Sequence, residues 1–197
     1  MASCMVVVIE VLCIFGLVSS QIVTLGTCPQ VKVQENFDLN KYLGKWYENR
    51  RYANWFSLFS NCVTAEYSKL SETSVKVNNT GWLYLSNEIS TAIGNAVVQD
   101  GAKLGVRFSE FAPFGAYWVL STDYTSHSIV WSCEESPKGA IQFNSQYLWI
   151  LTRSPKGVSE TEMDRLFDIL HGYGINTDIR KLKPTKQTNC FGRNMKM

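Results

Sequence analysis

The stretch Leu43-Gly44-Lys45-Trp46-Tyr47-Glu48 contains the motif Gly-x-Trp at the start of a long series of strand-like runs. About seventy residues later, Tyr117-Trp118-Val119-Leu120-Ser121-Thr122-Asp123-Tyr124 ends in Thr-Asp-Tyr. A third stretch, Tyr147-Leu148-Trp149-Ile150-Leu151-Thr152-Arg153, ends the strand-rich part with an arginine. Gly-x-Trp alone occurs by chance in many chains, so the order and spacing of the three motifs carry the argument.

Composition agrees with a β-rich protein that has a sizeable core. Of the 197 residues, 45% are apolar, 13% are aromatic and only 18% are charged. Flat aromatic side chains suit strands, and they either fill a β-barrel solidly or line a cavity in it. The formal net charge of +2 is small, and the charges are dispersed. Nucleic acid is therefore not expected as a partner.

The N-terminus has the pattern of a secretory signal peptide. Residues 5–18 are almost entirely apolar, and Val18 and Ser20 suit the small-residue positions before a cut at Gln21. Glu10 interrupts the run, and no Lys or Arg precedes it. The run is too short for a membrane anchor. We expect a signal peptide over residues 1–20, a single domain over 21–197, and a secreted, extracellular protein.

Four cysteines follow the expected signal peptide, at positions 28, 62, 133 and 190. An even number in a secreted chain predicts two disulfides, and their positions alone permit three pairings. The spacings are wide and contain no Cys-x-x-Cys, so we expect no zinc site. We expect no other metal and no cofactor.

Eight strand-like runs follow one another at short spacing, near residues 45–53, 62–70, 73–80, 84–98, 103–109, 115–122, 127–134 and 146–153. Turn signals separate them, at 79–81, 100–101, 113–115 and 137–139. Gly94 is expected to bend or break the fourth run. The pattern predicts an all-β fold, an eight-stranded antiparallel up-and-down barrel that closes on itself.

Three segments lie outside this pattern. Residues 21–36 are expected to be irregular, residues 38–43 to form a short 3₁₀ turn, and residues 177–182 to be extended and to add to the sheet. One C-terminal α-helix is predicted after Ser159, with an apolar stripe for packing on the barrel wall and an end at Gly172. The stripe consists of Met163, Leu166, Phe167 and Leu170. A less favoured interpretation makes the stripe a partner-binding surface.

The three motifs together resemble the signatures of the lipocalins. Such a fold implies a barrel whose interior holds one small ligand. The resemblance implies that Trp46 plugs the closed end, that Arg153 crosses its face in a cation–π contact, and that Gly44 lets the chain turn into the barrel. We therefore expect these three residues to be structural rather than ligand contacts.

Within the family, residues 27–192 are similar to the apolipoprotein D group, which includes insect bilin-binding protein and Lazarillo. The similarity is carried by residues 43–48, 103–109, 117–124 and 149–155. All four cysteines fall on that group's positions. The resemblance implies the disulfides Cys28–Cys133 and Cys62–Cys190.

Ligand contacts are expected on the inward faces of the strands, where every second side chain points. Tyr147, Trp149 and Leu151 share one face of the last strand. The resemblance adds pocket positions at Tyr67, Asn79, Phe108, Tyr117 and Trp149. Alternation adds Val77, which shares the face of Asn79, and Val119, which shares the face of Tyr117. The alternative is that these side chains simply fill the barrel.

Asn78-Asn79-Thr80 is the only N-glycosylation sequon. If Asn79 points into the barrel, Asn78 must point outward, as a glycan requires. A turn at this place would remove that alternation. Glycosylation of Asn78 is expected on this condition.

Two connections at the expected open end are apolar, and exposed apolar clusters mark interaction sites. Their side chains are Trp55, Phe56, Leu58 and Phe59 in one connection, and Phe111 and Phe114 in the other. They could close over a ligand, dock on a lipoprotein or membrane surface, pair two monomers, or fold inward as a lid. We expect a monomer or a weak dimer.

An enzyme is not expected. The chain has only two histidines, His127 and His171, and lacks the His-Glu-x-x-His, Gly-x-Ser-x-Gly and phosphate-loop motifs. The predicted function is that of a carrier, for transport or sequestration of a small hydrophobic ligand such as a lipid, sterol, retinoid, fatty acid or bilin. The alternatives are an interaction protein that uses its apolar open-end loops for lipoprotein or partner docking, and a barrel enzyme.

Overall fold

The computed structural model describes residues 22–53, 59–139 and 141–190. The expected signal peptide lies outside these ranges. The elements, in chain order, are β1 (Ile22–Leu25), α2 (Leu39–Tyr42), β2 (Gly44–Tyr52), β3 (Ser60–Lys69), β4 (Ser74–Leu83), β5 (Glu88–Asp100), β6 (Lys103–Arg107), β7 (Gly115–Thr122), β8 (His127–Glu135), β9 (Phe143–Thr152), α3 (Glu160–Gly172) and β10 (Leu182–Pro184).

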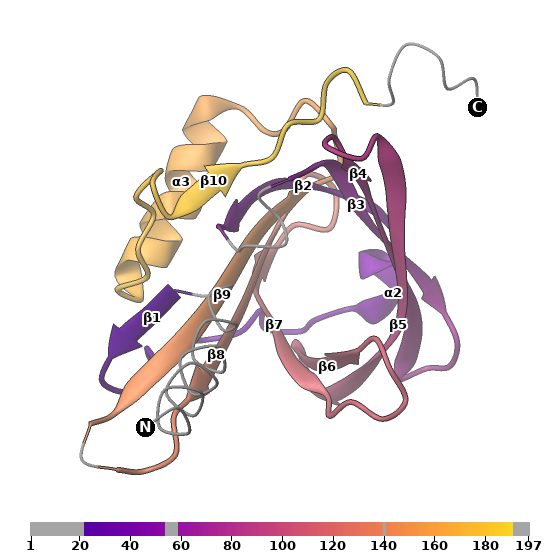
Figure 1. Ribbon diagram of the computed structural model, residues 1–197. Coiled ribbons are helices and arrows are strands. Elements are labelled where there is room, and N and C mark those ends of the chain that lie inside the picture. The colour runs from indigo at the N-terminus through magenta and orange to yellow at the C-terminus, as the bar shows by residue number, and fades with distance from the viewer. Residues whose placement is uncertain (1–21, 54–58, 140, 191–197) are drawn as a thin grey trace, which may run out of the picture.

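Strands β2 to β9 form a closed antiparallel barrel (Figure 1). Each pairs with its neighbours in sequence, and the ring closes between β2 and β9, where Tyr47 lies opposite Thr152. The short turns between β3 and β4, β5 and β6, and β7 and β8 lie at the same end as Trp46. The other end has the four-residue turn between β4 and β5 and the three longest connections, between β2 and β3, β6 and β7, and β8 and β9. The predicted eight-stranded up-and-down barrel is confirmed.

The helix α3 packs on the outside of the barrel, beside β9 and β10 in Figure 1. Ser159 caps it by accepting a hydrogen bond from the backbone N–H of Glu162. Leu166 and Leu170 are fully buried in a second hydrophobic cluster, outside the barrel, which includes Trp131 of β8. The predicted stripe therefore serves packing.

The half of the barrel at the closed end, near Trp46, is filled by its own side chains. Its fully buried side chains include Trp46, Ala96, Leu104, Val119 and Val130. Because this end is filled, space for a ligand remains only in the half nearer the open end.

Three predictions about the flanking segments were wrong in detail. Residues 22–25 of the supposedly irregular segment form β1, which pairs with residues 143–146 of β9. The turn before Gly44 is α-helical rather than 3₁₀, and Asp38 caps it through the N–H groups of Asn40 and Lys41. The last extended piece pairs with β2 as β10, which begins only at Leu182.

The turn expected at residues 79–81 lies instead at 84–87, so β4 continues to Leu83. Gly81 serves close packing here: a Cβ at this position would lie 3.3 Å from Cγ2 of Val63 on β3. Gly94 does not break β5 either, since it pairs regularly with Val77. The strand β6 ends at Arg107, two residues earlier than predicted.

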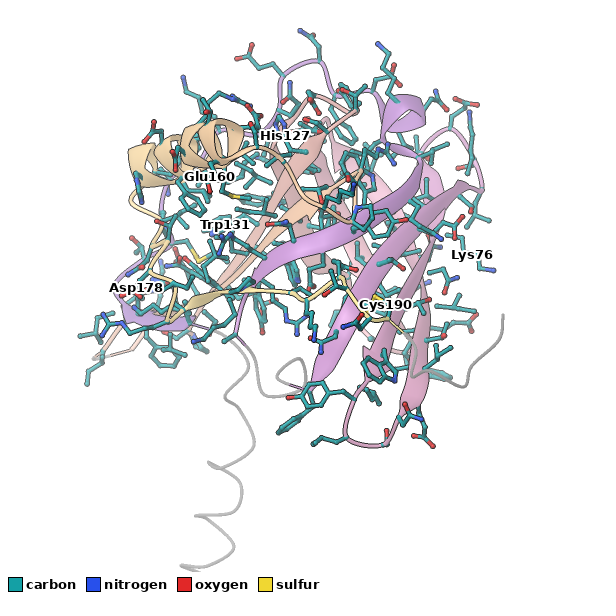
Figure 2. The ribbon with its side chains drawn as sticks, turned by 90° about the horizontal axis from the view of Figure 1, so that it is seen from above. Lys76, His127, Trp131, Glu160, Asp178 and Cys190 are labelled. Carbon is teal, nitrogen blue, oxygen red and sulfur yellow. A yellow bond between two sulfur atoms is a disulfide. The ribbon has the colours of Figure 1, made fainter. Side chains whose placement is uncertain are left out.

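Both disulfides implied by the resemblance are present. Cys28–Cys133 ties the segment after β1 to β8, and Cys62–Cys190 ties the C-terminal tail to β3. Figure 2 shows this tail running from the region of Asp178 along the outside of the barrel to Cys190. Among the described residues, no helix is long and apolar enough to cross a membrane.

Candidate ligand-binding site

A cavity of about 230 Å³ occupies the half of the barrel nearer the open end. Strands from most of the ring supply its wall, so the barrel itself surrounds it. Its lining residues are Glu48, Val63, Thr64, Ala65, Tyr67, Val77, Asn79, Val106, Phe108, Gly115, Ala116, Tyr117, Trp149 and Leu151.

Seven of the nine predicted pocket residues line this cavity, namely Tyr67, Val77, Asn79, Phe108, Tyr117, Trp149 and Leu151. Val119 and Tyr147 do not. Val119 is one inward step nearer the closed end and is completely buried in the packed core. Tyr147 lies where β9 is leaving the barrel, because the residues just before it pair with β1 instead of β2.

Tyr147 nevertheless supports the cavity wall. Its ring stacks on that of Trp149, with centroids 6.0 Å apart and planes inclined by 6°. The stacked pair holds the indole of Trp149 in place at the side of the cavity. An aromatic surface fixed in this way is ready to contact a flat ligand without further ordering.

Sequence reasoning missed half of the lining. Glu48 could have been found, because it shares the inward face of Trp46 two residues earlier on β2. Nothing in the sequence marked Thr64 or the small residues Ala65, Gly115 and Ala116 as lining residues, since small side chains line a cavity by leaving space free. Val63 reaches the cavity beside an irregularity in the β3–β4 pairing between Asn61 and Thr64.

Hydrogen-bonded hydroxyls form the floor of the cavity. The Tyr117 hydroxyl lies 2.7 Å from that of Tyr67 and 3.0 Å from that of Tyr42, which in turn lies 2.9 Å from Ser128 Oγ. Burial raises the pKa of Tyr42 to about 12 and raises the pKa of Tyr67 and Tyr117 well above the ordinary value. The phenols therefore stay neutral, and the floor can share hydrogen bonds with a ligand.

Two further polar groups lie in the wall. The carboxylate of Glu48 pairs with the buried guanidinium of Arg51 and accepts a hydrogen bond of 2.6 Å from Thr185 Oγ1 in the tail. The side-chain oxygen of Asn79 is buried and has no hydrogen-bond partner among the described residues. A buried acceptor without a partner is costly, so a ligand that donates to Asn79 gains affinity.

The barrel base has the expected architecture. The guanidinium carbon of Arg153 lies 3.7 Å from the ring centroid of Trp46, which is fully buried. Gly44 has φ of +90°, and a Cβ on it would lie 3.4 Å from Nη1 of Arg153. These residues are separated from the cavity by the packed core and do not line it.

Neither histidine lines the cavity. His127, labelled in Figure 2 beside α3, is buried between barrel and helix, with Nδ1 3.0 Å from Glu162 Oε1 and Nε2 3.4 Å from Nη2 of Arg165. Desolvation lowers the pKa of His127, against the opposing effect of Asp123 and Glu162. Its position ties α3 to the barrel.

The structure describes part of the two apolar connections at the open end. Phe111 is 98% exposed, and Phe59 and Phe114 are about one-third exposed. Phe111 therefore does not fold inward as a lid, and none of the three lines the cavity. Trp55, Phe56 and Leu58 lie outside the described residues. Asn78 is on β4 opposite the exposed Ile93 and so on the outer face, where it is half-buried and its side-chain oxygen is buried.

Comparison with known proteins gives consistent matches. A family model described as a lipocalin-like domain matches residues 37–187. Apolipoprotein D of Bos taurus is 38% identical over 180 residues, covering 90% of this chain and 91% of that protein. Lazarillo protein of Schistocerca americana is 33% identical over 178 residues, covering 84% and 76% respectively. The structure of insecticyanin from the tobacco hornworm Manduca sexta superposes with a TM-score of 0.73 at 22% identity, covering 87% and 93%.

Proposed function

Because the chain belongs to the lipocalin family, we propose that it is a secreted carrier that binds one small hydrophobic molecule in the barrel cavity, for transport or sequestration. The observation that carries the proposal is the cavity itself. It is surrounded by the barrel wall, adjoins a packed base and presents the Trp149 ring that stacks on Tyr147. A barrel filled with its own side chains would leave no such space.

The cavity favours a largely apolar ligand with a few polar groups. Trp149, Phe108, Val77 and Leu151 supply apolar surface, while the tyrosine hydroxyls and Asn79 supply polar contacts. This combination is usual for small-molecule sites. A volume of about 230 Å³ is small for a lipid, so a larger ligand must extend beyond the cavity.

Substitution of Trp149 tests the proposal. Parent protein is titrated with retinoic acid, a sterol, arachidonic acid and biliverdin, with tryptophan fluorescence and ligand absorption as readouts. At least one should bind saturably, and Trp149→Ala should weaken that binding at least about tenfold, or about 1.4 kcal/mol, without unfolding the barrel. Trp82→Ala, on the outer face of β4, is the matched control and should bind as the parent does.

If no ligand binds the parent below tens of micromolar, the carrier proposal fails. If one binds parent and Trp149→Ala equally, the protein is a carrier but the contact has been assigned to the wrong residue. Absorption spectra and native mass spectrometry of protein from its natural source would identify a bound ligand directly.

The second candidate is an interaction protein that docks through the open end on a lipoprotein or membrane surface. The exposure of Phe111 favours it, because a phenylalanine without cover is costly in water. Phe111→Ser would abolish binding to phospholipid vesicles if this surface docks there. The same change would leave ligand binding in the cavity intact.

A further inference from the structure

A second hollow lies outside the barrel wall, directly beside the cavity. This outer cleft measures about 210 Å³ and is lined by Ile93, Gly94, Asn95, Arg107, Phe108, Ser109 and Glu110. Phe108 lines both the cavity and the outer cleft, and its side chain is 48% exposed. The ring of Phe108 is therefore the partition between the two.

The cleft exists because β5 and β6 differ in length. Their pairing ends at Asn95 opposite Arg107, whereas β5 continues to Glu88 on the open-end side. Residues 88–94 thus have no β6 partner, and the chain from Phe108 onward leaves the sheet. A Cβ on Gly94 would lie 2.7 Å from Cδ1 of Phe108 and 2.5 Å from the Arg107 oxygen, so glycine lets this ring lie against the wall.

The two hollows differ in charge. The cavity is lined by Glu48, whose carboxylate is paired with Arg51, and no cation is among the described residues that line it, so an anionic group finds no opposite charge there. The outer cleft contains the guanidinium of Arg107, which uses Nη1 for the Glu110 backbone oxygen at 3.2 Å and stacks at 4.6 Å on Phe114. Guanidinium has five N–H donors, so this hydrogen bond leaves donors for a ligand.

Other polar groups around the cleft bear on what it can take. The side-chain oxygen of Asn95 is buried and has no partner among the described residues. It can accept from a hydroxyl of a ligand or from a water that the ligand carries. Lys76 stands opposite Asn95 on β4 and adds positive charge, whereas the exposed Glu110 opposes an anion.

We propose that the outer cleft is a subsite for the anionic head group of a single-chain amphiphile, whose hydrocarbon chain fills the cavity after the Phe108 ring is displaced. The inference rests on the proposed carrier function and names its ligand class. The proposed subsite accounts for the small volume of the cavity. A hydrocarbon chain longer than the cavity would continue past Phe108 and place the head group of the ligand at Arg107. Arg107 then makes a charge-assisted hydrogen bond with the head.

The test measures binding of hexadecanoic acid, its methyl ester and the short decanoic acid to the full chain, with and without substitutions. Arg107→Gln should weaken hexadecanoic acid about tenfold and leave the methyl ester within twofold. Phe108→Ala should strengthen hexadecanoic acid relative to decanoic acid, because the partition no longer has to move. Lys156→Gln, an exposed cation after β9, and Phe111→Ala are the matched controls, and both should bind as the parent does.

Thermal melts first establish that each variant is folded. The inference is overturned if Arg107→Gln weakens acid and ester equally, if Lys156→Gln has the same effect, or if Phe108→Ala changes both acids by the same factor. Hexadecyl phosphate is a second probe: loss of its binding in Arg107→Gln marks the subsite as general for anionic heads, and no loss overturns it. If other hydrophobic ligands bind saturably while these effects are absent, only this subsite fails. If nothing binds the parent, the carrier function fails with it.

Discussion

Arg153 joins the segments that meet at the closed end of the barrel. Besides covering Trp46, it donates hydrogen bonds to the backbone oxygens of Lys41, Leu43, Lys45 and Tyr124. These oxygens belong to α2, to the start of β2 and to the turn between β7 and β8. One planar cation therefore joins the backbone of three segments.

Arg153→Ala should lower the free energy of unfolding by about 3 kcal/mol, because it removes a cation–π contact and several charge-assisted hydrogen bonds. Arg153→Lys should recover only part of this, since an ammonium lacks the planar fork. Urea unfolding followed by fluorescence gives the values, with Lys156→Ala as control. A variant that unfolds at the parent's urea concentration but has lost its ligand would show that Arg153 belongs to the binding site.

At the scale of elements, the tyrosine network links parts of the molecule that are distant in sequence. Tyr42 is on α2, Tyr67 on β3, Tyr117 on β7 and Ser128 on β8. Their hydroxyl contacts fix the short helix α2 across the barrel, beneath the cavity. The network is thus a structural crosslink, and two of its members, Tyr67 and Tyr117, also line the cavity.

This network should make the fold sensitive to alkaline pH. Below about pH 10 the tyrosines are protonated in both states, and stability does not change with pH through them. Between pH 10 and 12 the unfolded chain releases protons that the folded chain retains, because the folded pKa of Tyr42 is about 12. The free energy of unfolding should then fall by about 1.4 kcal/mol per pH unit for each such tyrosine.

Urea unfolding at pH 8 to 12 measures this dependence. Tyr42→Phe should reduce the alkaline slope by about 1.4 kcal/mol per pH unit. At pH 8 it should cost about 1–2 kcal/mol, since Tyr117 and Ser128 lose a hydrogen-bond partner. Tyr173→Phe, outside the network, is the control. An unchanged slope in Tyr42→Phe would contradict the account.

Alternation and turn signals predicted the existence and order of the eight barrel strands and of α3, while several strand ends were displaced. The strand β1 was missed because four residues are too few to show a pattern, and it forms only against β9. The turn between β4 and β5 was misplaced because Gly81 suggested a turn, whereas this glycine allows close contact with Val63. Val119 points into the barrel as predicted. The alternation of side chains does not tell, however, how far the packed core extends along the barrel, and Val119 lies in that core rather than in the cavity.

For the whole molecule, the C-terminal tail completes the barrel wall. The β2–β3 pairing ends at Tyr47 opposite Thr64. Beyond it, the Gln187 side-chain amide donates to the backbone oxygens of both Glu48 and Val63, at 2.9 and 2.8 Å. Cys62 also donates its N–H to the Lys186 oxygen. The tail therefore bridges two strands that have separated beside the cavity.

The Cys62–Cys190 disulfide fastens this tail and closes a separation of 128 residues, against 105 for Cys28–Cys133. Chain entropy gives each an upper value of about 4–5 kcal/mol. Replacing both members of either pair with serine should therefore lower the free energy of unfolding by similar amounts. Only the Cys62/Cys190 variant should raise hydrogen exchange at the tail amide of Thr185, which donates to the Asn49 oxygen, and weaken ligand binding, because of the two disulfides only this one fastens the tail beside Glu48. Equal exchange in the tail of both variants would show that the Gln187 contacts suffice to hold it.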